Sequence, residues 1–201
     1  MSKHQKKEDL RITKTKIKLS NALIELLKNR SIDTISISNL CDASNISRAT
    51  FYNNFNSIYD VLNCYLAGLK KQLDDAYAKE KKATSMTLRS SFDFIIRLAV
   101  NHLVTNKNNI KAVLKNNTNS NFHNTIATFF TASIKEVLMA HEIEMAVLGI
   151  SISSLASFLS GGISMLLISF IYDDTNKNKD EFVDECSRII ANIFRLNEVR
   201  Y

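Results

Sequence analysis

The sequence contains no proline and no tryptophan, and only four of its 201 residues are glycine. Sandwiches, barrels and doubly wound sheets need frequent tight turns, and glycine and proline normally supply the backbone angles of those turns. Their scarcity disfavours these sheet architectures. We therefore predict an all-α protein.

Cysteine is also scarce, since Cys41, Cys64 and Cys186 are the only three and lie far apart. This spacing provides no disulfide framework, no CxxC pair and no zinc-ligand pattern. The sequence also lacks a glycine-rich phosphate loop, an HExxH motif and a Gly-x-Ser-x-Gly motif. We therefore expect reduced thiols, and we predict no catalytic residue, no metal site and no cofactor, which argues against an enzyme.

The first eight residues are polar and basic, without the apolar segment of a secretory signal. Residues 145–172 form a run of 28 residues without a charged side chain, longer than the roughly 20 residues that cross a bilayer. The run contains seven serines and the Gly161-Gly162 pair, a composition that a soluble helix buried on most sides also shows. We predict a cytoplasmic protein without membrane contact, and a membrane-anchored protein is the alternative.

The charge that is present is unevenly distributed. Residues 1–71 hold 12 Lys and Arg against 6 Asp and Glu, which gives the whole formal net charge of +6. Residues 72–201 hold 14 residues of each sign and are neutral. A basic N-terminal third beside a neutral remainder favours a polyanionic partner for the first third.

Apolar periodicity and asparagine-rich breaks predict about nine helices. The first has an apolar stripe that includes Ile12, Ile17, Leu19, Leu23, Leu26 and Leu27. The expected helices span 10–29, 36–43, 47–54, 57–82, 86–105, 108–116, 121–141, 144–172 and 179–197.

Residues 34–54 have the composition of a helix-turn-helix. Ser36, Ser47 and Ser57 are predicted N-caps, and Asn45 is predicted to take the left-handed conformation in the turn. Apolar residues of the first short helix can pack on Ile46 and Phe51. This packing leaves small and polar side chains on the opposite face, namely Arg48, Ala49, Thr50, Asn53 and Asn54, and such side chains suit base edges in the major groove.

The segment from Ser36 to Phe55 resembles the signature of the TetR (tetracycline-repressor-like) regulators. The agreement comprises Ile37, Leu40, Ala43, Ile46, Ser47, Thr50, Phe51, Tyr52 and Phe55, and the resemblance extends over about residues 11–71. It departs from the pattern at Ser31, Asn45 and Asn54, and at Ile58, where the family usually has a lysine that contacts a DNA phosphate.

The resemblance implies a three-helix DNA-binding domain over residues 1–56 and a helical effector-binding and dimerisation domain over residues 57–201. It implies DNA contacts from Ser47, Arg48, Thr50, Tyr52 and Asn53, with phosphate contacts from Ser36 and Ser38. Arg48 has the chemistry to pair with guanine and Asn53 to pair with adenine. Nearby lysines and arginines add a basic arm and first helix, namely Lys3, Lys6, Lys7, Arg11, Lys14, Lys16 and Lys18.

The same resemblance implies a ligand pocket in the middle helices and a dimer interface in the last two. The candidate pocket residues are Phe92, Ile95, Ile96, His102, Phe122, Phe129 and Phe130. The candidate interface residues are Ser157, Gly161, Gly162, Met165, Phe182, Cys186, Ile190 and Phe194. Packing within a single chain is the alternative explanation for both sets.

The sequence therefore predicts a dimeric transcriptional repressor that binds a palindromic operator in double-stranded DNA and is released by an unknown small-molecule effector. A regulator of this type that activates transcription, or that responds to a protein partner, is the alternative. A buried cavity would favour the effector, and a solid core with an exposed apolar groove would favour the partner.

Overall fold

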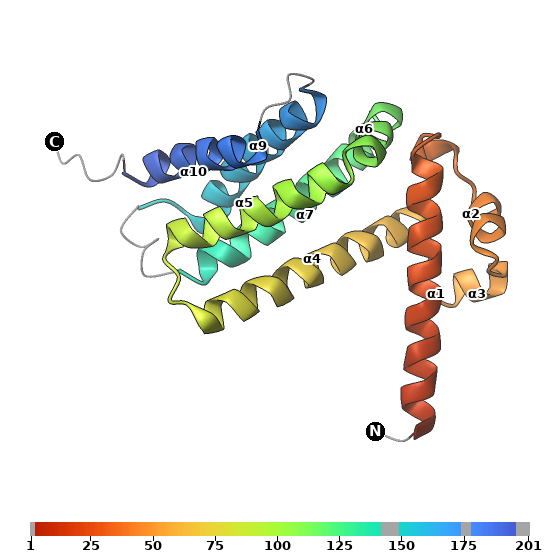
Figure 1. Ribbon diagram of the computed structural model, residues 1–201. Coiled ribbons are helices and arrows are strands. Elements are labelled where there is room, and N and C mark those ends of the chain that lie inside the picture. The colour runs from red at the N-terminus through yellow and green to blue at the C-terminus, as the bar shows by residue number, and fades with distance from the viewer. Residues whose placement is uncertain (1–2, 142–148, 174–177, 196–201) are drawn as a thin grey trace. The chain divides into compact units, whose positions relative to one another are not determined.

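The structure is a computed structural model that describes residues 3–141, 149–173 and 178–195, with the backbone alone for residues 3–9 and 194–195 (Figure 1). Its described part contains nine α-helices, one short 3-10 helix and no strand, so the all-α prediction is confirmed. The helices are α1 (Lys3–Leu27), α2 (Ile37–Ser44), α3 (Arg48–Tyr52), α4 (Ile58–Ala83), α5 (Leu88–Thr105), α6 (Lys107–Asn116), α7 (Ser120–Met139), α9 (Ile152–Tyr172) and α10 (Lys179–Arg195), with the 3-10 helix η1 (Ile32–Thr34) after α1.

The chain divides into two compact units. The first contains residues 1–70 and 109–123, and the second contains residues 71–108 and 124–201. The domain boundary predicted after residue 56 therefore lies inside the first unit, because the first half of α4 and most of α6 belong to it.

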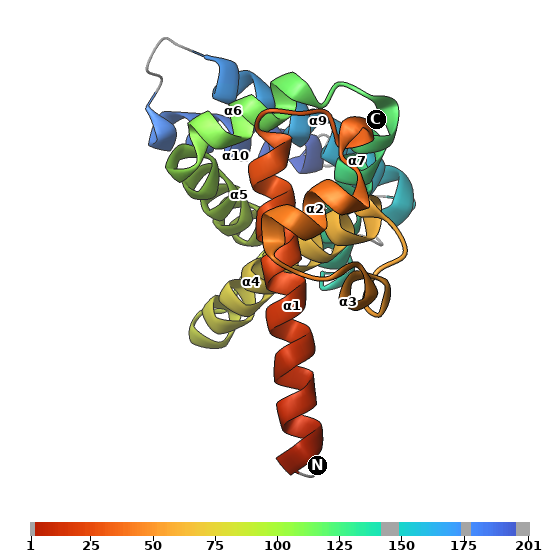
Figure 2. The same cartoon turned by 90° about the vertical axis from the view of Figure 1, so that its right-hand side faces the viewer.

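The first unit is built around α1, with α2 packed against it and α3 following α2 (Figure 2). Leu19, Leu23 and Leu27 are fully buried on one face of α1. Ile12 and Ile17, earlier in the same stripe, are exposed, so only the later part of the stripe is buried in this unit. Burial of each leucine stabilises the unit by about 1.5–3 kcal/mol.

Local hydrogen bonds and backbone angles set the ends of several helices in this unit. The Ser36 hydroxyl accepts a hydrogen bond from the Asn39 N–H, and the Asn39 side chain accepts one from the Ser36 N–H, forming a capping box. Ser57 and Asp60 cap α4 in the same reciprocal way. Asn45 ends α2 with a φ of 52°. The predicted caps and the left-handed turn are confirmed.

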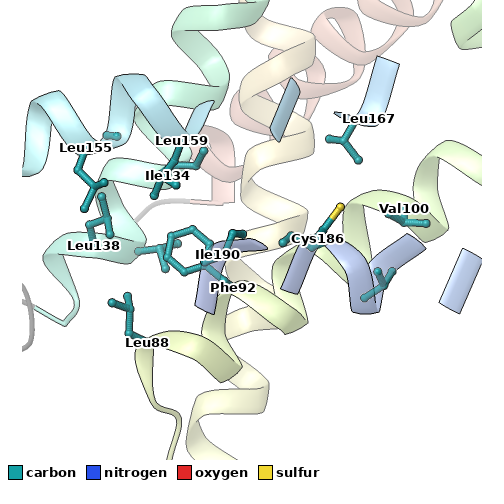
Figure 3. Packing of buried hydrophobic residues seen from close by; sticks show 14 of the residues in the cluster. Leu88, Phe92, Val100, Ile134, Leu138, Leu155, Leu159, Leu167, Cys186 and Ile190 are labelled. Atoms are coloured by element: carbon teal, nitrogen blue, oxygen red, sulfur yellow. The ribbon is translucent and has the colours of Figure 1, made fainter. Parts of the chain in front are cut away.

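The second unit has an apolar core formed by α5, α7, α9 and α10 (Figure 3). Leu138 of α7 and Val100 of α5 are almost completely buried in it. Phe170 of α9 stacks on Phe182 of α10, with ring centroids 4.4 Å apart. Helix α10 packs mainly against α5, so the last helix belongs to the core of its own chain.

The single helix predicted over residues 144–172 is interrupted at residues 149–151, and its first five residues, 144–148, lie outside the described part of the chain. Helix α9 begins at Ile152, and the Ser151 hydroxyl caps it by accepting from the Ser154 N–H. Gly149 has a positive φ of 64°, a left-handed conformation that glycine adopts at little cost. The turn at Gly149 and the cap at Ser151 therefore set the start of α9 within the uncharged run.

Helix α9 is long and apolar enough to cross a membrane, with a mean hydropathy of 1.8 in its most apolar window. A core helix gives the same signal, and seven residues of α9, among them Leu155, Leu159 and Leu167, are buried within the chain. Only 39% of the residues in this apolar stretch of α9 are buried. The expectation of a helix buried on most sides is therefore wrong. One face of α9 remains exposed.

Candidate nucleic-acid interface and ligand cavity

Helices α2 and α3 and the turn between them form the predicted helix-turn-helix. The turn is closed by backbone hydrogen bonds from the Asn45 N–H to the Asp42 carbonyl (3.2 Å) and from the Ile46 N–H to the Cys41 carbonyl (3.0 Å). Ser47 then caps α3 by accepting from the Thr50 N–H at 3.2 Å. These short-range bonds fix the direction in which α3 leaves the turn.

Helix α3 has one buried and one exposed face. Phe51 is completely buried, with its ring centroid 5.4 Å from that of Tyr52 and 6.0 Å from that of Phe55. Arg48, Ala49, Tyr52 and Asn53 are exposed on the other side, and Tyr52 is 59% exposed. Phe51 anchors the helix, and the exposed residues form a polar surface that carries a positive charge.

Three residues predicted to face DNA use their polar groups inside the motif. The Ser47 and Thr50 hydroxyls lie 2.9 Å apart. The half-buried Asn54 donates its side-chain amide to the Thr50 carbonyl at 2.8 Å. Asn54 therefore stabilises the C-terminal end of α3 and is less suited to contact bases than Arg48 or Asn53.

Arg48 and Ser38 are linked directly, since the Arg48 guanidinium donates a hydrogen bond to the Ser38 hydroxyl. This bond connects the first residue of α3 to the second residue of α2, ten positions earlier in the chain. It leaves the other donors of the guanidinium fork available for a phosphate or a guanine. The sequence pattern did not predict this contact.

The basic residues of α1 differ in their surroundings. Arg11, Lys14 and Lys18 are exposed. The Lys16 ammonium lies 5.9 Å from the centroid of the Phe55 ring, within the range of a cation–π contact. The side chains of Lys3, Lys6 and Lys7 lie outside the described part of the chain. Ile58, at which the resemblance implies a lysine, is half-buried at the start of α4.

The predicted interface residues divide between surface and core. Ser157, Gly161, Gly162 and Met165 are exposed on α9. Three of the residues predicted on α10 lie instead in the core of their own chain, namely Phe182, Cys186 and Ile190. This burial corrects their assignment to a surface that faces a partner. The side chain of Phe194 lies outside the described residues. The apolar stripe of α10 therefore has an intrachain partner in α5.

The second unit contains a cavity of about 390 Å³, hereafter the apolar cavity. Most of its lining is aliphatic or aromatic, from α4, α5, α7 and α9, and Phe92, Ile134 and Leu167 of this lining are labelled in Figure 3. The lining residues are Leu73, Asp74, Tyr77, Phe92, Ile95, Ile96, Ala99, Phe129, Phe130, Ser133, Ile134, Glu136, Val137, Ile163 and Leu167. Its volume lies in the range of about 300–1,000 Å³ that is typical of small-molecule sites.

Five of the seven predicted pocket residues line this cavity, namely Phe92, Ile95, Ile96, Phe129 and Phe130. The other two do not line it. His102 is exposed on α5, and partial desolvation of its ring lowers the pKa of the imidazole. Phe122 is buried in the first unit.

Tyr77 is a lining residue that the sequence analysis missed. It lies four residues after Leu73 on α4, and this helical spacing places both on one face of the helix. The Tyr77 hydroxyl lies 2.8 Å from the Ser91 hydroxyl, and that hydroxyl is 2.9 Å from Nε2 of the buried His141. A buried chain of polar groups therefore supports one wall of the cavity.

Among the described residues, no group of three or more His, Cys, Asp or Glu side chains lies close enough together to bind a metal ion. The three cysteines are free thiols. Burial raises the pKa of Cys41, so its thiol stays protonated near neutral pH.

Comparison with known proteins gives a consistent result. A family model described as the C-terminal region of a transcriptional regulator (TetR_C_8) matches residues 90–192, which are 103 of the 201 residues. No curated protein matches the chain.

Among solved structures, the TetR transcriptional regulator from Streptococcus agalactiae is 18% identical, with a TM-score of 0.59 over 91% of this chain and 97% of that one. The regulator FadR from Thermus thermophilus, a TetR-family repressor solved in complex with lauroyl-CoA, is 17% identical with a TM-score of 0.62, over 88% and 93%. The fatty acid degradation regulator FadR from Bacillus halodurans is 12% identical with a TM-score of 0.62, over 88% and 94%. At these identities the structures establish a common fold.

Proposed function

The chain belongs to the TetR family of transcriptional regulators, and on that premise we propose that it is a dimeric repressor that binds a palindromic operator and is released by a small-molecule effector. It belongs to a family of regulators and not of enzymes. We place its action in the cytoplasm, where it meets chromosomal DNA. Helix α3 contacts bases in the major groove, and the basic residues of α1 contact the phosphate backbone.

The observation that carries the DNA-binding proposal is the division of α3 into two faces. Phe51 fixes the helix to the first unit, while Arg48, Tyr52 and Asn53 remain exposed on one surface. Arginine and asparagine have the donor and acceptor pattern for guanine and adenine, and tyrosine suits a phosphate oxygen. Five helical residues reach only a few base pairs, so specific binding requires a second copy.

A stripe on α9 supports dimerisation. Phe158 and Met165 are 68% and 63% exposed. Gly161 and Gly162 are exposed between them, and Ser157 is exposed next to Phe158. A Cβ atom added at either glycine would meet open space, so the small residues leave room for another helix to approach. A twofold axis through this face would pair the α9 helices and place two recognition helices on a palindrome.

The apolar cavity supports a small-molecule effector over a protein partner. It is lined mainly by apolar side chains and has the volume of a ligand site. The T. thermophilus neighbour was solved with lauroyl-CoA, an amphipathic molecule, and we assign the cavity of this chain to the apolar part of an amphipathic effector. Helix α4 carries Tyr77 and Leu73 of the cavity wall.

The test is a footprinting and gel-shift titration with DNA from the upstream region of the protein's own gene. We expect a protected site with twofold symmetry, and an affinity that falls steeply between about 50 and 200 mM salt. Arg48→Ala and Tyr52→Ala should each weaken binding about tenfold. Arg30→Ala removes an exposed arginine outside the helix-turn-helix and is the matched control. Unchanged affinity in both α3 variants would overturn the assignment of the interface.

A further inference from the structure

We infer that the apolar cavity selects its ligand by shape, and that the apolar part of this ligand is a compact ring system of about 12–15 carbon atoms, not an extended alkyl chain. This inference rests on the proposed effector role of the cavity and specifies the class of molecule that fills it. Its basis is the volume of the cavity compared with its length, and Ser133 is the residue that keeps the cavity wide.

The length of the cavity follows from the helices that line it. On α5 the lining extends from Phe92 to Ala99, a separation of seven residues that corresponds to a rise of about 10 Å. On α7 it extends from Phe129 to Val137, a separation of eight residues and about 12 Å. The lining segments of α4 and α9 are shorter, about one turn each. The cavity is therefore about two helical turns long.

The two longer lining segments each present a broad face to the cavity. Ile95 and Ile96 are consecutive on α5 and both line the cavity, and Phe129 and Phe130 do the same on α7. Consecutive residues of a helix are about 100° apart around its axis, so a single row of side chains would include only one residue of each pair. The cavity is therefore wider than one row of side chains.

The volume leads to the same conclusion. An apolar cavity of about 150 Å³ holds one benzene molecule, which corresponds to about 25 Å³ per carbon atom. At that density the 390 Å³ of this cavity accommodate about 15 carbons. An extended chain advances about 1.2 Å per bond, so a single strand of chain places only about nine carbons in this length and leaves more than about a third of the space empty. A ring system fills the same length with more carbons and keeps the contacts that empty space would lose.

The polar groups of the lining contribute little to the choice of ligand, because they have partners inside the protein. The Ser133 hydroxyl donates to a backbone carbonyl of its own helix at 3.0 Å, and the Tyr77 hydroxyl lies 2.8 Å from that of Ser91. Asp74 and Glu136 are exposed residues that make other interactions within the protein. Shape and apolar contact therefore decide which ligand fits.

Ser133 lies at the centre of the α7 face that lines the cavity. Phe129 is four residues before it and Val137 is four residues after it, and all three line the cavity, as expected for positions that share one face of a helix. The small side chain of Ser133 leaves the middle of the cavity open. Ser133→Leu would narrow the cavity at half its length and obstruct a wide ligand more than a thin one. Ala132 is exposed and does not line the cavity, so Ala132→Leu is the matched control.

The experiment compares cyclododecanol with dodecanol, which have the same number of carbon atoms and one hydroxyl group each. Both displace the neutral dye N-phenyl-1-naphthylamine from the full-length protein without DNA. The extended chain leaves about three carbons outside the cavity, and each CH₂ group removed from water raises the affinity about fourfold. Because bending of the linear chain recovers part of this loss, we expect cyclododecanol to bind about tenfold more tightly.

Ser133→Leu should lower the affinity for cyclododecanol at least about tenfold and that for dodecanol less than about threefold, while Ala132→Leu changes neither. If Ser133→Leu does not fold, Ser133→Val narrows the cavity less and should shift the ratio in the same direction. Equal or tighter binding of dodecanol, absence of binding by the dye or by both alcohols, or a ring preference that persists in the folded Ser133 variants would each overturn the inference. Loss of the preference in the Ser133 variants alone supports it.

A gel shift with operator DNA separates this inference from the proposed function. Cyclododecanol that binds with the expected preference but does not release the operator would refute the effector role and leave the ligand class intact. A linear compound that releases the operator and binds more tightly than cyclododecanol would retain the effector role and overturn the inference.

Discussion

The side-chain carbonyl of Asn117 accepts a hydrogen bond from the backbone N–H of Ile32 at 2.7 Å, across 85 positions of sequence. Asn117 is completely buried. Its amide nitrogen lies 3.2 Å from the carbonyl of Leu27, at the end of α1, and 2.9 Å from that of Val113, in α6. One side chain therefore satisfies backbone groups of α1, η1 and α6 within the first unit.

We predict that Asn117→Ala lowers the free energy of unfolding by about 2–3 kcal/mol, because it leaves the buried Ile32 N–H and the surrounding carbonyls without a partner. Urea denaturation followed by circular dichroism measures this change. Asn109→Ala, an exposed asparagine on α6, should stay within about 0.5 kcal/mol of the native protein. Equal losses in the two variants would show that the buried amide has no special role.

The turn of the helix-turn-helix gives a second prediction. Asn45 has a φ of 52°, and a residue with a Cβ pays about 1–2 kcal/mol for this conformation unless its side chain bonds locally. We expect Asn45→Ala to lower the thermal midpoint and Asn45→Gly to leave it unchanged or raise it. A differential scan of both variants compares them directly. A glycine variant as unstable as the alanine variant would contradict this account.

The Arg48–Ser38 hydrogen bond distinguishes two roles for Ser38. If Ser38 orients the Arg48 guanidinium, Ser38→Ala should weaken operator binding about threefold in the native protein and have no further effect in an Arg48→Ala background. If Ser38 instead contacts a phosphate independently, the two losses should add. The geometry favours the first result, and a double-mutant cycle by gel shift measures it.

Local patterns were sufficient to predict the DNA-binding motif. Ser36, Asn45 and Ser47 act through hydrogen bonds or backbone angles within a few residues of themselves, so their roles follow from residue type and spacing. The buried position of Phe51 follows equally from the apolar period. These features depend on short stretches of chain and not on the arrangement of distant helices.

Roles that depend on distant segments were missed or misassigned. Asn117 falls in the asparagine-rich break between the expected helices 108–116 and 121–141, and nothing near it in the sequence indicates a bond to Ile32. Apolar periodicity identifies a buried face but not its partner, and for this reason Cys186 and Ile190 were assigned to a dimer interface although α5 covers them. Tyr77 was missed because a single tyrosine within the polar segment 74–83 of α4 gives no signal of a cavity.

The final prediction concerns the exposed stripe of α9. Phe158 is 68% exposed beside Ser157 and Gly161, and an aspartate there would place a charge in the centre of the proposed dimer interface. We expect Phe158→Asp to convert the protein from dimer to monomer in light scattering after size exclusion. Its operator affinity should fall at least about tenfold, because one recognition helix contacts only half of the palindrome.

Val104→Asp is the matched control, since Val104 is an apolar residue that is also exposed, on α5, and lies outside the stripe. It should leave both the mass and the operator affinity unchanged. A Phe158→Asp protein that remains dimeric would place the twofold contact elsewhere on the chain. A monomer that still binds the full operator with native affinity would separate dimerisation from DNA recognition and remove the basis for a palindromic site.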